Sequence, residues 1–311
     1  MSKLMNQPSM NALALAALTL LTACGGGGSD STTDTSTSME TAQSVSANTV
    51  ALPEDSAVAM STTMSTAQAV VAGGQVGATY NCTGGGTATF AATGGTVASL
   101  LNGQLDAGEN YVLQFNACRG SAGAATVNGS MSLAVTAASA GTLTVDTRTQ
   151  GITVTLPQRT LTLNGNSTLS QTVVTSGSTV VTTVHWTSPQ IALTSVRNGV
   201  TGTLTLSSID VTRSFTTNGG VLAGSTHSGG LTLAATLPAN VWSADLATQG
   251  TVSYDANGVP TQGSWTITLP NNRLGLQLGA GTATVTVDNG SDGTIDHTYT
   301  FLIASLNSSA A

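Results

Sequence analysis

Charged residues are scarce in this 311-residue chain: Asp, Glu, Lys and Arg together make up 7 % of it, far below the usual quarter. Lys3 is the only lysine, and the formal net charge is −7. An acidic chain without a basic cluster argues against nucleic acid as a partner and against electrostatic attraction to anionic lipids. With so few charges, the surface must be covered largely by Thr, Ser, Asn, Gln and Gly.

Aromatic residues amount to only 4 % of the chain, and familiar catalytic motifs are missing. The sequence has no G-x-S-x-G, no H-E-x-x-H, no Walker A motif and no G-x-G-x-x-G before a helix. Asp106 and Glu109 could pair for glycoside hydrolysis, but that chemistry needs a sugar cleft usually lined with aromatics, so we expect a solvated turn there. The histidines, His185, His227 and His297, are scattered and make no metal pattern. We therefore predict that the chain is not an enzyme.

The chain does contain a short apolar run, residues 12–21, which leads into Leu21-Thr22-Ala23-Cys24 and four glycines. The run is too short to span a bilayer and is typical of a signal peptide. This segment resembles the lipobox of bacterial lipoproteins. The resemblance implies that residues 1–23 are a signal peptide, that a diacylglycerol is attached to the Cys24 thiol, and that the new amino terminus carries an acyl chain such as palmitate. An ordinary secretory leader with a chance cysteine is the alternative interpretation.

The residue after Cys24 bears on location. The inner-membrane retention signal of such lipoproteins is usually an Asp at that position, whereas this chain has Gly25. The resemblance therefore implies a lipid-anchored protein of the outer membrane of a Gram-negative cell, facing either the periplasm or the cell surface. Two or three acyl chains would hold it durably, because one chain alone binds only marginally. The membrane is thus the expected partner, reached through the lipid on Cys24.

Two segments are expected between the anchor and the main domain. Residues 24–52 are rich in Gly, Ser and Thr, and we predict that they form a disordered tether. A helix is predicted over residues 53–74, because Pro53, Glu54 and Asp55 suit a first turn and the Gly73-Gly74 pair suits an end. The apolar residues on or near one face of this helix are Val58, Met60, Met64, Ala67 and Val71.

Residues 75–311 change to a period of two. Ile152, Val154 and Leu156 alternate with polar residues, which is typical of half-buried strands. The Asn-Gly pairs begin at Asn102, Asn128, Asn164, Asn198, Asn218, Asn257 and Asn289. Asn-Gly fits a type I′ hairpin turn, and the run around Asn164 is the cleanest example. We predict an all-β domain of roughly twelve to sixteen strands: a large antiparallel meander curled into a barrel, roll or sandwich, preceded by one helix.

Cys82 and Cys118 are the only cysteines besides Cys24. In an exported protein they are expected to form a disulfide bond. A two-thiol metal or redox site is the alternative, although no C-x-x-C spacing or nearby histidine supports it. Tyr80-Asn81-Cys82-Thr83-Gly84-Gly85, together with the stretch 107–118, resembles segments of uncharacterised β-rich proteobacterial lipoproteins. This similarity supports the disulfide and implies no activity.

One acidic loop, residues 288–296, resembles a D-x-[DN]-x-D-G-x-x-D calcium loop. Its candidate ligands are Asp288, Asp292, Thr294 and Asp296. It departs from the pattern at Gly290, where a third-position ligand is missing, and at Tyr299, where an EF-hand has a bidentate Glu. The alternative is a hairpin loop whose Asp and Asn side chains bind their own backbone. A calcium ion here would be a weak structural ligand, and no other cofactor is expected.

Together these features predict an outer-membrane-anchored lipoprotein with a non-enzymatic role in surface interaction or envelope structure. The first alternative is a β-barrel carrier of a lipid or small apolar ligand, and the second is a hydrolase. A cavity larger than its side chains fill would favour the carrier. A His–carboxylate–Ser cluster in one cleft would favour the hydrolase, and a filled core with exposed edges would favour the first function. The sequence does not name the protein or ligand partner.

Overall fold

The computed structural model describes residues 36–96, 100, 102–120, 125–236 and 241–309. The expected signal peptide (1–23), the lipidation site Cys24 and the first part of the expected tether lie outside the described residues.

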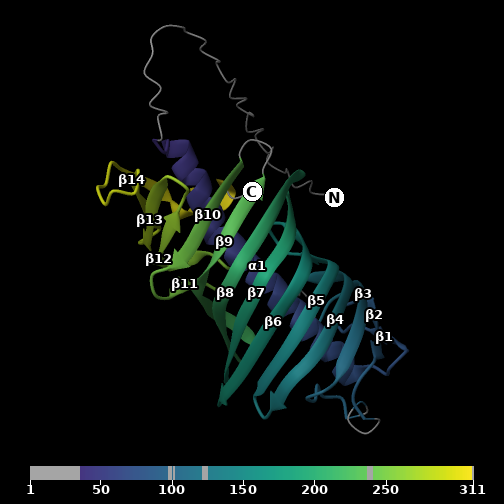
Figure 1. The fold of residues 1–311 in the computed structure, drawn as a ribbon. Coiled ribbons are helices and arrows are strands. Elements are labelled where there is room, and N and C mark those ends of the chain that lie inside the picture. The colour runs from purple at the N-terminus through teal and green to yellow at the C-terminus, as the bar shows by residue number, and fades with distance from the viewer. Residues whose placement is uncertain (1–35, 97–99, 101, 121–124, 237–240, 310–311) are drawn as a thin grey trace, which may run out of the picture. The chain divides into compact units, whose positions relative to one another are not determined.

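The described chain forms one antiparallel sheet of fifteen strands in sequence order, with β11 continuing the position of β10 between β9 and β12 (Figure 1). The strands are β1 (Thr79–Asn81), β2 (Thr87–Ala92), β3 (Asn110–Cys118), β4 (Thr126–Ser139), β5 (Thr142–Thr155), β6 (Thr160–Ser176), β7 (Thr179–Arg197), β8 (Val200–Asn218), β9 (Val221–Thr236), β10 (Val241–Thr248), β11 (Val252–Tyr254), β12 (Pro260–Thr268), β13 (Asn272–Gly279), β14 (Thr282–Asn289) and β15 (His297–Leu302). The predicted all-β meander preceded by one helix is confirmed.

A row of β-bulges crosses the middle of this sheet. The register shifts between β3 and β4, β4 and β5, β5 and β6, β6 and β7, and β8 and β9. Each bulge bends its strand and increases the local twist. In β5 the inward-facing residues change from odd to even numbers across the bulge, so that Val145 and Ile152 are both buried. The long central strands therefore curve while keeping one apolar face inward.

The bulges correct one prediction. Asn128-Gly129 and Asn164-Gly165 lie inside β4 and β6 and are not hairpin turns, so the run from Leu161 to Leu169 is one bulged strand. Both glycines have positive φ, which a bulge can require as much as a turn does. The Asn198-Gly199 pair does form the turn between β7 and β8.

The helix α1 (Met39–Gly73) begins earlier than predicted. Residues 39–52, expected to be part of a disordered tether, are helical, and Pro53 lies inside the helix and not at its start. The side chain of Ser38 accepts a hydrogen bond from the backbone N–H of Thr41 and so caps the first turn. No described helix combines the length and apolar character needed to cross a membrane.

Burial explains why α1 forms despite its Ser, Thr and Val content. Six consecutive residues, 45–50, are buried, which is more than one full turn. The helix is therefore enclosed on all sides there, and Figure 1 shows it running along the sheet across most of the strands. It contacts β2, β4, β14 and the short C-terminal helix α3 (Ile303–Ser309). Tertiary packing, more than intrinsic propensity, stabilises this helix.

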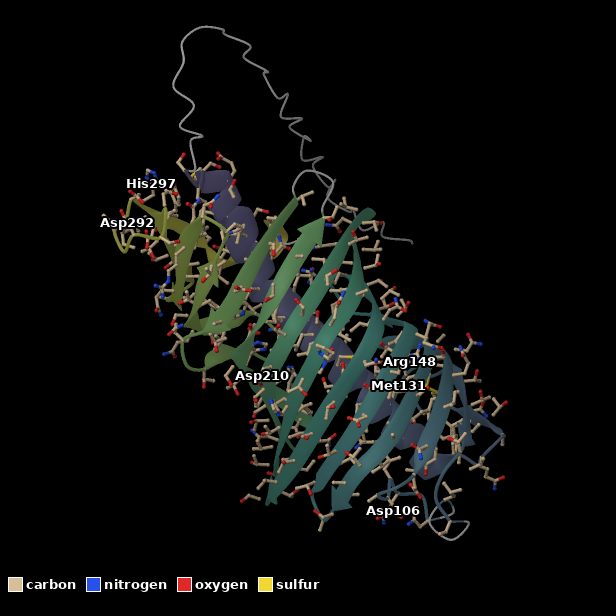
Figure 2. All side chains as sticks on the ribbon, viewed as in Figure 1. Asp106, Met131, Arg148, Asp210, Asp292 and His297 are labelled. Atoms are coloured by element: carbon tan, nitrogen blue, oxygen red, sulfur yellow. A yellow bond between two sulfur atoms is a disulfide. The ribbon has the colours of Figure 1, made fainter. Side chains whose placement is uncertain are left out.

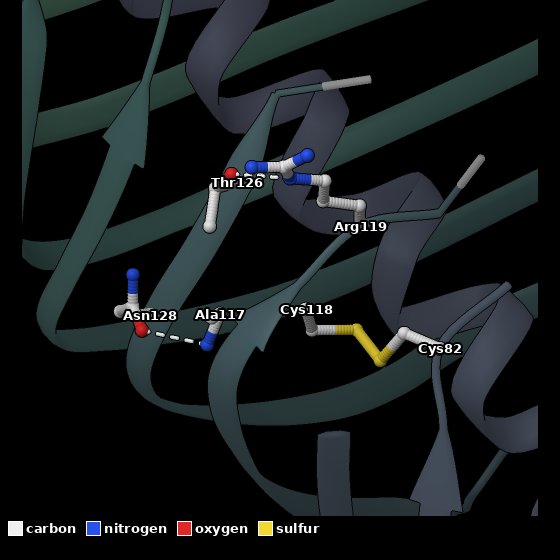
Figure 3. The surroundings of a disulfide bond; sticks show 6 residues. All are labelled: Cys82, Ala117, Cys118, Arg119, Thr126 and Asn128. Atoms are coloured by element: carbon white, nitrogen blue, oxygen red, sulfur yellow. Dashed lines mark hydrogen bonds between the residues drawn. A yellow bond between two sulfur atoms is a disulfide. The ribbon is translucent and has the colours of Figure 1, made fainter. Parts of the chain in front are cut away.

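The predicted disulfide is confirmed. Cys82 and Cys118 are bonded, with their Cα atoms 5.5 Å apart, and both are buried (Figure 3). The bond joins the end of β3 to the segment between β1 and β2. Beside it, the side chain of Asn128 accepts a hydrogen bond from the N–H of Ala117, the bulged residue of β3.

Candidate functional site

The scarce charges of the chain gather at the middle of α1. Glu54 and Asp55 face Arg213 and Arg159 across the contact between helix and sheet. Arg197 lines the same cavity as these four residues. The sequence has seven basic residues, of which one is Lys3, so this place holds three of its six arginines.

Glu54 is buried in this cluster, with 3 % of its surface exposed. Its Oε1 accepts hydrogen bonds from Nε of Arg213 at 2.8 Å and from Oγ of Ser225 at 3.2 Å. Its Oε2 lies 3.5 Å from Nδ1 of His227. Burial acts to raise the pKa of Glu54, but His227 and Arg213 outweigh it, and the pKa is lowered. Glu54 is therefore a buried carboxylate anion.

For Asp55, in contrast, the effect of burial on the pKa outweighs the attraction of its arginine partner. Its Oδ2 lies 2.9 Å from Nε of Arg159, whose side chain is 1 % exposed. Burial raises the pKa of Asp55 to about 6, against the opposing attraction of Arg159 and with a further rise from the charge of Glu54. Burial also lowers the pKa of Arg159, although Asp55 counteracts the effect. Two neighbouring carboxyl groups thus differ strongly in their affinity for a proton.

Strand alternation positions the partners on the sheet. Val211 and Arg213 point inward from β8, and Ser225 and His227 point inward from β9, because residues two apart share a face. Tyr254, on β11, donates a hydrogen bond to the carbonyl oxygen of Val50 at 3.3 Å. The helix is thereby held at its middle by polar contacts to three strands.

A cavity of about 630 Å³ lies beside this cluster. Its polar lining includes Glu54, Asp55 and the three arginines, and its apolar lining includes Val50, Val58, Leu156, Leu222 and Val259. The turns between β5 and β6 and between β11 and β12 contribute to its wall. A volume of this size, with apolar walls and a few convergent polar groups, is typical of small-molecule sites.

The cluster contains a histidine, a carboxylate and a serine, but they are not arranged for nucleophilic catalysis. Ser225 donates its hydroxyl hydrogen to Glu54, and His227 faces the other oxygen of the same carboxylate. A serine nucleophile needs the histidine between itself and the acid, so that the imidazole can remove its proton. In this order the carboxylate holds both residues in place and activates neither.

The acidic loop forms the connection between β14 and β15, at one end of the sheet (Figure 2). Asp288 is 5 % exposed, and its two oxygens accept the N–H groups of Asp292 and Gly293 at 2.9 and 3.1 Å. Asp292 accepts the N–H of Thr294, and Asp296 accepts that of Asn289. These contacts match the hairpin-loop alternative, because the carboxylates bind their own backbone.

Calcium binding by Asp288, Asp292, Thr294 and Asp296 stays a prediction. Among the described residues, no three His, Cys, Asp or Glu side chains gather where they could hold a metal ion. A calcium ion would therefore have to rearrange the loop. Unfolding curves recorded with calcium and with a chelator separate the two interpretations.

The remaining candidates lie apart from the cluster. Glu109 is buried, so the prediction of a solvated turn is wrong for this residue. Its Oε2 accepts hydrogen bonds from the hydroxyl of Tyr111 and the N–H of Asp106, both at 2.8 Å, and so holds the turn in place. His185 and Asp210 form an exposed pair at 2.7 Å. Figure 2 shows Asp106, Asp210 and His297 at separate places on the sheet.

Comparison with protein-family models, with curated proteins and with solved structures finds no match to this chain.

Sequence reasoning missed the cluster on α1. It treated Glu54 and Asp55 as helpful charges at a helix start, where they would be solvated. The signal that could have found it is the scarcity of charged residues, which make up 7 % of the chain. In such a chain, two adjacent acids followed by an apolar stripe indicate that arginine partners should be sought. Which arginines pair with them depends on strand register across long sequence separations, which no local pattern gives.

Proposed function

We propose that this chain is a lipid-anchored protein of a bacterial outer membrane, and that its β domain has a non-enzymatic role in surface interaction or envelope structure. The observation that carries the proposal is the placement of α1. Its side chains occupy the inward face of the sheet, where Val50, Leu52 and Met60 are at most 1 % exposed. An inward face that the chain covers with its own helix favours a rigid module that acts through its surface.

The outer face supports the same function. Hydroxyl side chains of neighbouring strands lie opposite one another there, as in Thr153 with Thr162 at 2.9 Å and Thr183 with Ser214 at 2.7 Å. Such cross-strand hydroxyl pairs stabilise a sheet without adding charge. The result is a broad, sparsely charged and hydrogen-bonding surface, which suits contact with other envelope components.

The described part of the chain begins close in sequence to the proposed anchor. Thr37 is already held by the sheet, because its N–H donates to Asn289 and its hydroxyl accepts from Asn272. If Cys24 is lipidated, only residues 25–36 remain as a tether, twelve in number (36 − 24 = 12). Even at full extension, twelve residues span at most about 43 Å. The domain would then stay close to the lipid headgroups.

Fractionation of cells tests the anchor. We expect the native chain in the outer-membrane fraction and the Cys24→Ala variant in the soluble fraction or retained as uncleaved precursor. Ser29→Ala, a small change just after the anchor, is the matched control and should fractionate like the native chain. An equally membrane-associated, mature Cys24→Ala protein would contradict the proposal.

A deletion strain tests the role. In the bacterium that encodes the chain, deletion should increase the permeability of the outer membrane or reduce attachment to surfaces, and the native gene should restore both. The Cys24→Ala gene should not. A deletion strain with unchanged permeability and unchanged attachment would refute a structural or surface role.

The cavity beside α1 favours a second candidate function, that of a binding module for a small ligand. Its volume of about 630 Å³ is within the range of known ligand sites. Its lining carries both charged and apolar side chains, unlike the purely apolar interior expected for a lipid carrier.

A further inference from the structure

Arg213 has donor capacity that the fold does not use. Its side chain is 10 % exposed, lines the cavity beside α1 and donates from Nε to Glu54. Its guanidinium carbon lies 5.3 Å from the centre of the Phe215 ring. Within the described residues, its two terminal nitrogens have no hydrogen-bond acceptor. A guanidinium carries five N–H donors, so the terminal nitrogens can donate to a ligand in the cavity that Arg213 lines.

We propose that the cavity beside α1 binds a small organic acid, with one carboxylate on the guanidinium of Arg213 and an apolar body against the aliphatic wall. Arginine is suited to this task because its terminal nitrogens form a planar fork that matches the two oxygens of a carboxylate. The wall offered to the apolar body is formed by Val50, Val58, Leu156, Leu222 and Val259. The site does not depend on the proposed lipid anchor.

The acids that line the cavity are already occupied, which argues against a cationic ligand. Glu54 accepts from Arg213 and Ser225, and Asp55 pairs with Arg159. Asp255 accepts the N–H groups of Asn257 and Val259 in its own turn, at 2.8 and 2.9 Å. The other oxygen of Glu54, Oε2, lies 3.5 Å from Nδ1 of His227. An amine would compete with these donors and would meet three arginines, whereas an acceptor would find open donors on Arg213.

The charge balance selects a singly charged acid over a phosphate. Three arginines and three carboxylates line the cavity, Arg159, Arg197, Arg213, Glu54, Asp55 and Asp255. The site is therefore close to neutral, so every added negative charge is repelled by Glu54 and Asp55, and a doubly charged phosphate is disfavoured more than a singly charged carboxylate. A carboxylate with a hydrocarbon chain satisfies Arg213 and covers apolar surface at the smallest electrostatic cost.

Calorimetric titration of the purified full chain tests the proposal with four defined probes: octanoate, octanol, acetate and inorganic phosphate. Octanol keeps the apolar body but lacks the charge, acetate keeps the charge but lacks the body, and phosphate is a bare oxyanion. A titration into the same detergent solution without protein is the blank. We expect saturable binding of octanoate, and at least tenfold weaker binding of each of the other three.

Variants locate the site. Arg213→Gln should weaken octanoate binding at least tenfold while changing octanol binding less than threefold. Arg273→Gln removes the same charge from the exposed side of β13 and should leave octanoate binding unchanged. If Arg213→Gln fails to fold, Val58→Trp, which fills the cavity from a half-buried position on α1, takes its place and should abolish binding.

Each contrary outcome overturns the proposal. Absence of octanoate binding to the native chain, or equal binding of octanoate and octanol, would show that no carboxylate site exists. Tighter binding of phosphate than of octanoate would replace the organic acid with an inorganic anion. Unchanged octanoate binding by folded Arg213→Gln or Val58→Trp would place the ligand elsewhere.

Discussion

At the scale of single residues, Asn-Gly pairs perform two different tasks in this chain. In turns, Asn and Gly adopt backbone conformations with positive φ, as Asn198 and Gly199 do. In the bulges the glycine supplies the conformation and the asparagine supplies an acceptor. Asn164 accepts the N–H of Gly151 on the neighbouring strand at 2.6 Å, and Asn128 does the same for Ala117. The side chain thus satisfies the donor that the bulge removes from the ladder.

The first prediction concerns this acceptor. Asn164→Ala should lower the free energy of unfolding by about 1 kcal/mol, because the N–H of Gly151 loses its partner. Gln114→Ala removes an amide from the exposed face of β3 and is the matched control, with an expected change of about 0.5 kcal/mol or less. Urea unfolding followed by circular dichroism measures both. Equal effects would show that the asparagine is not a structural part of the bulge.

Glu54 and Asp55 show how neighbouring residues acquire opposite chemistry. Glu54 points to Arg213 and His227, and its pKa is lowered. Asp55 points to Arg159, with 27 % of its side chain exposed, and its pKa is raised to about 6. The sign of each shift follows from whether the partners compensate the loss of water.

The second prediction is a pH dependence of stability. Between the ordinary pKa of 3.8 and the folded-state value of about 6, Asp55 holds a proton in the folded protein that it releases on unfolding. Stability attributable to Asp55 therefore falls as the pH rises through this window, by about 1–2 kcal/mol from pH 4.5 to 6.5. The lowered pKa of Glu54 has the opposite effect, but that effect appears as the pH falls below its ordinary value of 4.5.

Denaturant unfolding between pH 4.5 and 6.5 checks this dependence. The groups that set the pKa of Asp55 are Arg159, Glu54 and Arg197. Asp55→Asn should flatten the slope, whereas Asp245→Asn, on the exposed face of β10, should keep it. A slope that persists in folded Asp55→Asn would assign the dependence to another group.

At the scale of elements, α1 depends on its surroundings. It contains Pro53, which cannot donate a helical hydrogen bond, and many Ser, Thr and Val residues, which are weaker helix formers than Ala or Leu. Some of its hydroxyls bond within the helix, as when Thr49 and Thr63 donate to the carbonyl oxygens four residues earlier. Packing against the inward face of the sheet supplies the stability that the helix lacks on its own.

The third prediction follows directly. A synthetic peptide with the sequence of residues 39–73 should be largely unfolded in buffer at 25 °C, with about 20 % helix or less by circular dichroism, because nucleation is costly and propensity is low. A peptide with Pro53→Ala should gain only modestly. A strongly helical native peptide would show that α1 folds on its own and that the sheet merely receives it.

The element scale also shows what sequence reasoning can reach. Alternation over Ile152 and Val154 predicted strands correctly because burial of one face is a local property of the pattern. The start of α1 was missed because composition reports propensity, whereas residues 45–50 are helical through enclosure by distant strands. The Asn-Gly pairs at Asn128 and Asn164 suggest turns because bulges and type I′ turns both favour a glycine with positive φ.

The candidate site was less predictable than the fold. Cys82 and Cys118 could be paired because only two cysteines remained after the anchor. The contact between Glu54 and Arg213 joins residues 159 positions apart. It depends on the bulge in β8, across which the inward-facing residues change from even to odd numbers. A one-residue difference in that bulge would turn Arg213 to the other face.

At the scale of the whole molecule, helix and sheet belong to one compact unit, and we expect them to unfold together. The sheet has a linear strand order in which each strand mainly contacts its neighbours. The helix adds long-range connections: Thr37 binds β13 and β14, Glu54 binds β8 and β9, and the end of α1 contacts β2. Strands far apart in the order thereby share one partner.

The last prediction tests that dependence. Ala59 on α1 is 0 % exposed, so Ala59→Arg forces a long charged side chain into packed space and should destabilise by more than about 4 kcal/mol. Because the sheet packs its inward face on α1, the tryptophans of β7 and β12, Trp186 and Trp265, should lose their buried fluorescence together with the helical signal. Ser65→Arg places the same side chain on the exposed side of α1 and should unfold like the native chain. If Ala59→Arg removes the helical signal while both tryptophans keep a cooperative transition, the sheet folds without its helix. In that case α1 can detach from the inward face of the sheet without unfolding it.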